Sequence, residues 1–136
     1  MSTRNPSLAL LALSLLLAGC ASPGGSGVLN GTNAPGARIV LTDVNVVDGS
    51  LRDIVAHNNG TSTIPAGAWA FHLTGTTNGR ASSHDVTLQG PAVPPNQSVK
   101  LSFANDKQPD WQDGTGLTIQ ATSPSGVTGN VTVRTV

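Results

Sequence analysis

The chain has one cysteine, no tyrosine, no glutamate and only four phenylalanine and tryptophan residues in total among 136. A single cysteine excludes an internal disulfide, so apolar burial and backbone hydrogen bonds must stabilise the fold. The longest apolar run, residues 8–17, has roughly half of the ~20 residues that a transmembrane helix needs. No cluster of basic residues is present, which argues against nucleic-acid binding and against electrostatic attraction to anionic lipid.

Turn-forming residues are abundant instead. Sixteen glycines and nine prolines disfavour a helical bundle. From residue 38 onward, short runs of alternating apolar and polar residues recur about every ten residues, with turn signals between them. These runs cover residues 39–47, 51–58, 69–73, 82–88, 99–103, 117–121 and 131–133. We therefore predict an all-β chain with a single immunoglobulin-like β-sandwich of about seven strands.

An export signal is predicted at the N-terminus, where Arg4 precedes the apolar run. The run ends in Leu17-Ala18-Gly19-Cys20, which resembles the bacterial lipobox, a motif in which the cysteine thiol receives a diacylglyceryl group and the chain is cut before it. The resemblance implies a signal peptide over residues 1–19 and a mature protein held to the membrane by acyl chains on Cys20. In Gram-negative bacteria, Ala21 rather than aspartate after the cysteine favours the outer membrane over the inner one.

The segment after the cysteine is rich in glycine, serine, asparagine and proline and lacks apolar periodicity. This composition predicts that residues 20–36 are the lipidated cysteine and a flexible tether, with an r.m.s. span on the order of 20–25 Å. The sandwich domain is then expected over residues 37–136.

The domain resembles the bacterial CARDB-type immunoglobulin-like domains over residues 44–122. Its apolar strand ends in an Asn-x-Gly turn (Asn58-Asn59-Gly60), and a proline-rich turn leads into a later strand. The matching segments are residues 54–61, 69–73, 94–101 and 117–122. The chain departs from the family at Asn96, where glycine is usual, and in the long insertion at residues 105–116. The resemblance implies a module for surface display and interaction, with no catalytic residues to carry over.

No catalytic, metal or cofactor site is predicted. His57, His72 and His84 lie on three different predicted strands without metal-ligand spacing, so we interpret them as surface residues. The His84-Asp85 pair lacks a Gly-x-Ser-x-Gly motif, and we predict no enzyme.

Two segments carry candidate calcium ligands. The segment Asp43-x-Asn45-x-x-Asp48-Gly49 fails the EF-hand pattern because valine stands at its fifth position. A second group, Asp106, Asp110 and Asp113, would suit a bound Ca²⁺ or simply a solvated acidic loop, and the sequence does not decide between the two.

The two tryptophans have different predicted roles. Trp69 is in phase with Phe71 and Leu73, which predicts a core position. Trp111 stands in a polar loop, where it either caps the end of the sandwich or is exposed as a contact residue. We hypothesise that Trp111, Asp110 and Asp113 form the principal binding surface. The predicted function is interaction with another envelope component, and the alternative is a glycan-binding surface module that uses the loop tryptophan.

Overall fold

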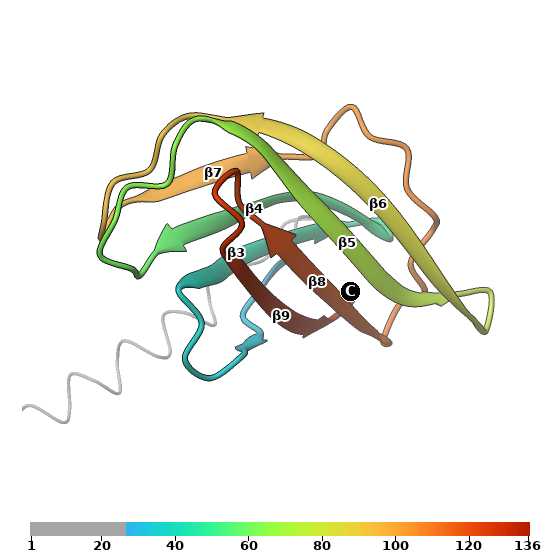
Figure 1. Cartoon of the computed structure of the whole chain (residues 1–136). Helices are drawn as coiled ribbons and strands as arrows, with labels where there is room; N and C mark the ends of the chain where they lie inside the picture. The colour runs from blue at the N-terminus through green and yellow to red at the C-terminus, as the bar shows by residue number, and fades with distance from the viewer. Residues whose placement is uncertain (1–26) are drawn as a thin grey trace, which may run out of the picture.

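The computed structural model describes residues 27–136, in which nine β-strands and no helix are found (Figure 1). The strands are β1 (Gly27–Leu29), β2 (Thr32–Asn33), β3 (Ile39–Val47), β4 (Ser50–Asn58), β5 (Gly67–Thr77), β6 (Arg80–Gly90), β7 (Ser98–Ser102), β8 (Gly116–Thr122) and β9 (Thr128–Arg134). The predicted all-β class is confirmed. The predicted signal peptide and Cys20 lie outside the described residues.

Two antiparallel sheets form a sandwich. One sheet has the strand order β1-β3-β4-β7 and the other has β2-β9-β8-β5-β6. The seven longer strands, β3 to β9, correspond one for one to the seven predicted runs. The chain crosses between the sheets from β4 to β5, from β6 to β7 and from β7 to β8, and such crossovers are typical of immunoglobulin-like sandwiches.

The short strands β1 and β2 lie in the segment that we expected to be a tether. Gly27 pairs with Val46 of β3, and Thr32 pairs with Thr132 of β9. The Asn33 side chain adds to this attachment, because it donates to the Leu41 carbonyl and accepts from the Leu41 amide at 3.0 and 2.8 Å. Residues 27–33 of the expected tether are therefore joined to both sheets of the sandwich.

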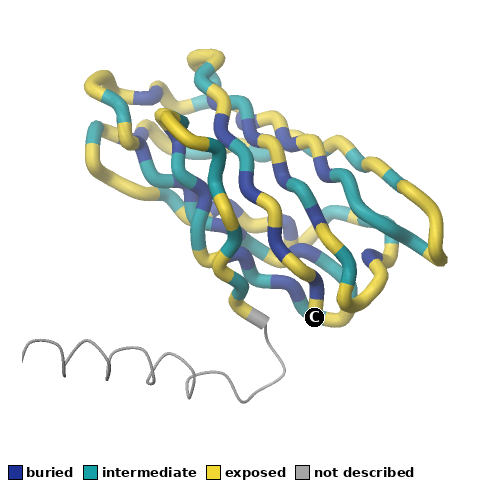
Figure 2. Tube along the Cα trace, turned by 90° about the horizontal axis from the view of Figure 1, so that it is seen from below, coloured by how far each residue is buried: buried dark blue, intermediate teal, exposed yellow. Residues whose placement is uncertain are grey.

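The core lies between the sheets and contains every phenylalanine and tryptophan of the chain. Trp69 on β5 is fully buried, as predicted, and Phe71, Phe103 and Trp111 are at most 2% exposed. Phe71 packs edge-on against Phe103, with ring centroids 4.9 Å apart. Buried and exposed residues alternate along the strands (Figure 2). Since no phenylalanine or tryptophan ring is left on the surface, the outer faces of the sandwich are polar and aliphatic.

Tight turns shape one end of the sandwich. The Asp48-Gly49 turn joins β3 to β4 and the Asn78-Gly79 turn joins β5 to β6, and all four residues have positive φ angles between 51° and 74°. This is the type I′ geometry that asparagine, aspartate and glycine favour. Asp43, where the first run is interrupted, also has a positive φ of 51° and lies at a β-bulge in β3. The calcium-like motif is thus a bulge followed by a hairpin turn.

The loops gather at two opposite ends of the strands (Figure 1). We call one the Trp111 end; it consists of the Asp48-Gly49 turn, the Asn78-Gly79 turn and the loop of residues 103–115. We call the other the proline end; it consists of residues 34–38, 59–66, 91–97 and 123–127. Because β1 runs antiparallel to β3, the described chain starts at the Trp111 end.

Candidate functional site

The loop of residues 103–115 closes the Trp111 end by binding both sheets. The Trp111 amide donates to the Gly49 carbonyl at 2.9 Å, and the Gln112 amide donates to the Thr76 carbonyl at 2.7 Å. Gly49 belongs to the β3–β4 turn and Thr76 to β5, so the loop joins one sheet to the other. The loop has a defined position although the sequence carries no strand or helix signal there.

Trp111 is 1% exposed, and the capping interpretation of this residue is therefore confirmed. Its ring packs against Gly75 of β5, where an added Cβ would come within 2.9 Å of the indole. The indole Nε1 donates to the Gln108 side-chain oxygen at 3.0 Å. The alternative expectation, that Trp111 offers an exposed ring to a partner, is wrong because the indole is buried. The ring instead fills the space at this end of the sandwich, between the two sheets.

Gln108 holds this arrangement in place. Its side-chain oxygen accepts from the Leu51 amide at 3.0 Å, and its side-chain nitrogen donates to the Leu51 carbonyl at 2.7 Å. The side chain therefore pairs with the start of β4 as a strand backbone would. Sequence reasoning missed this residue, since 57 positions separate it from Leu51.

A shallow cavity of about 480 Å³ lies at the same end. It brings together the two predicted contact residues Asp110 and Asp113, both exposed, with Asp48 and Asn78 from the two hairpin turns. Asp48 and Asn78 were not predicted for this site, although their Asp-Gly and Asn-Gly dipeptides marked them as turn residues. The cavity is thus an open, acidic surface whose aromatic component is buried beneath it.

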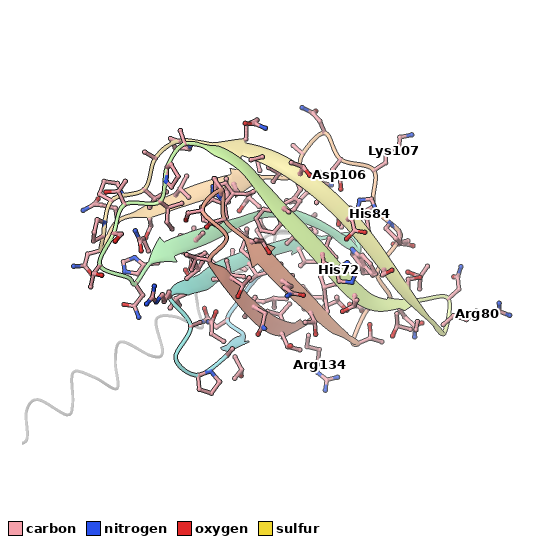
Figure 3. The ribbon with its side chains drawn as sticks, in the orientation of Figure 1. His72, Arg80, His84, Asp106, Lys107 and Arg134 are labelled. Carbon is pink, nitrogen blue, oxygen red and sulfur yellow. The ribbon has the colours of Figure 1, made fainter. Side chains whose placement is uncertain are left out.

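The three loop aspartates do not converge on one point. Asp106 contacts His84 of β6, with 2.8 Å between Asp106 Oδ2 and His84 Nε2 (Figure 3), whereas Asp110 and Asp113 line the cavity. Among residues 27–136, no group of three or more histidine, cysteine or acidic side chains is arranged to hold a metal ion.

The histidines are held in separate pairs. His72 contacts Asp85 across β5 and β6, with 2.5 Å between Nδ1 and Oδ1, and this pair is exposed. His84 and Asp106 are more enclosed, with side chains 22% and 18% exposed. His84 and Asp85, adjacent in the sequence, therefore serve two different pairs. Within residues 27–136, no hydrolase-like constellation forms around them.

One serine contacts a histidine: Ser98 Oγ lies 2.8 Å from His57 Nδ1. Ser98 is in the regular strand β7 rather than on a strained turn, and within the described part of the chain no carboxylate pairs with His57. Nucleophilic catalysis needs a base oriented by a third group. This contact links the neighbouring strands β4 and β7, and we assign it no catalytic role.

In residues 27–136 there is no helix of the length and apolar character that crossing a membrane would require. No protein-family model matches the chain, and no curated protein matches it.

Proposed function

We propose that the protein is a lipid-anchored, non-enzymatic lipoprotein of the bacterial envelope, whose immunoglobulin-like sandwich contacts another envelope component. The observation that carries the proposal is the Leu17-Ala18-Gly19-Cys20 motif at the end of a short apolar run. Two or three acyl chains on Cys20 give stable anchoring, whereas one chain gives marginal binding. With Ala21 after the cysteine, the outer membrane is the proposed destination in a Gram-negative cell.

The fold supports the interaction role. The seven longer strands form β3-β4-β7 on one side and β9-β8-β5-β6 on the other, and a buried tryptophan lies on β5. A buried tryptophan at a comparable place is a hallmark of immunoglobulin domains. We assign the domain to the CARDB type on these features and on the turn motifs in its sequence.

The glycan-binding alternative has no observation in its favour. It required an exposed aromatic platform, and all four phenylalanine and tryptophan rings of the chain are in the core. The free surfaces offer hydroxyl, amide and scattered charged groups instead. We therefore propose only the interaction with another envelope component.

Replacing the lipidated residue tests the anchor. Cys20→Ser removes the thiol that accepts the lipid, so we expect the variant to leave the membrane fraction or to accumulate as the uncut precursor. The measurement is cell fractionation with a carbonate wash, followed by a gel that separates precursor from mature protein. Ala21→Ser is the matched control and is expected to stay in the membrane. A Cys20→Ser protein of mature size that resists the wash would contradict the proposal.

A further inference from the structure

The position of the start of β1 limits the orientations that the domain can take relative to a membrane. Gly27 pairs with Val46, one residue before the end of β3, so the chain enters the sandwich at the Trp111 end. Six residues, 21–26, separate Gly27 from Cys20. Whatever their conformation, the seven Cα–Cα steps from Cys20 to Gly27 reach about 25 Å at most.

That reach is short compared with the domain. From Val46 back to Ile39, β3 covers about 23 Å at ~3.3 Å per residue, and the loops of the proline end extend beyond it. To bring the proline end to the membrane surface, the linker would have to be fully extended and run back along the whole sandwich. A tether of sixteen residues would have imposed no such limit.

We propose that the Trp111 end faces the bilayer and that the proline end points away from it. This inference rests on the proposed lipid anchor at Cys20. Linker length rather than charge sets the orientation, because three basic residues nearly balance the four aspartates of the Trp111 end, which are Asp48, Asp106, Asp110 and Asp113. The basic residues are Arg80 at the hairpin tip, Lys107 in the loop and Arg134 at the end of β9 (Figure 3).

The orientation changes where a partner meets the domain. The predicted contact surface around Asp110 and Asp113 is turned towards the headgroups, and the proline end is presented to the aqueous side. That end carries six of the nine prolines, and Arg38 is the only charged residue in its four segments.

The loops of the proline end are also tied together. The Asn58 side chain donates to the carbonyls of Ser62 and Val93, each at 2.9 Å, and the backbones of Ile64 and Val93 pair in a β-bridge. The proline end is thus a nearly uncharged surface whose loops are held in one conformation.

Two cysteine variants test the orientation in the full-length lipidated protein. Ala81→Cys replaces an exposed alanine at the start of β6, and Ala92→Cys replaces one two residues beyond its end, about 36 Å away at ~3.3 Å per residue. Cys20 is the sole native cysteine and its thiol holds the lipid, so each variant has one thiol for a fluorescent donor. The proteins are reconstituted in phosphatidylcholine vesicles that carry an energy acceptor on the headgroup.

We expect energy transfer from position 81 to exceed transfer from position 92 by roughly two-fold or more, given the ~36 Å between them. A variant with ten Gly/Ser residues inserted after Ala21 should reduce this difference, because the linker gains about 35 Å of reach. Equal or reversed transfer in the protein with the native linker overturns the orientation. Labelled protein that does not float with the vesicles overturns the lipid anchor, and the orientation with it.

Discussion

Trp69→Ala is expected to lower the free energy of unfolding by about 3–5 kcal/mol, because it removes a large ring from the centre of the core. Trp69 is fully buried on β5, and its ring lies 6.5 Å from that of Phe71. An added Cβ at Gly90 of β6 would come within 3.0 Å of the indole, so the neighbouring strand packs tightly against the Trp69 ring. Domains of this size are stable by about 5–15 kcal/mol, and the loss is a large share of that. Urea unfolding of a soluble form that begins at residue 27 measures it.

Trp69→Phe is the matched control. It keeps an aromatic ring in the core and removes Nε1, which has no hydrogen-bond acceptor among the described residues. An unpaired buried donor costs on the order of 1–3 kcal/mol, so its removal offsets part of the lost packing. We expect the phenylalanine variant to lose well under half of what the alanine variant loses. A loss below about 1 kcal/mol for Trp69→Ala would be that of a surface substitution and would contradict the core assignment.

Trp111→Ala is expected to cost a similar amount, about 3–5 kcal/mol, because the indole fills the end of the sandwich rather than standing in solvent. The substitution also removes the donor to Gln108, which holds the start of β4. The same unfolding experiment measures the loss, and protection of the Leu51 amide from hydrogen exchange should fall with it.

Asp110→Ala is the control for Trp111, since the two residues are neighbours in the loop and Asp110 is exposed. Surface substitutions of this kind change stability by about 0.5 kcal/mol or less. If Trp111→Ala were as mild as Asp110→Ala, the ring would not be capping the sandwich. An exposed aromatic contact surface would then return as the better interpretation.

The seven longer strands were predictable because the residues on one face of each are more buried than those on the other face. Alternation places Trp69, Phe71 and Leu73 on one side of β5, and burial confirms this side as the core. Turn residues marked the boundaries between strands, since Asn78 and Gly79 both tolerate the positive φ angles that a type I′ hairpin turn requires. Local sequence is sufficient for such features because the period of two and the turn geometry are both local properties.

The strands β1 and β2 were not predictable in the same way. They have three and two residues, too few for a periodic pattern, and they form only because β3 and β9 offer free edges. Residues 27–33 therefore pair with the sheets although the sequence carries no periodic signal there. The proposed orientation rests on this pairing.

The arrangement of the candidate site also depended on distant contacts. A tryptophan between polar residues is equally consistent with an exposed loop, and its burial becomes evident only when Gly75 is seen beneath the ring. Likewise, Asp106 is 22 positions from His84, and no local sequence pattern indicates that the two side chains meet. Pairings between elements are set by the packing of the two sheets, which single-sequence patterns do not specify.

The most direct test of the central claim is the mass of the N-terminal tryptic peptide of protein extracted from bacterial membranes. After Arg4 the next basic residue is Arg38, so the mature protein should yield one peptide from Cys20 to Arg38. We predict that its mass exceeds that of the unmodified peptide by a diacylglyceryl group, with or without a further acyl chain on the amine. A peptide that begins at another residue, or that carries a free Cys20 thiol, would contradict the claim that this protein is a lipoprotein.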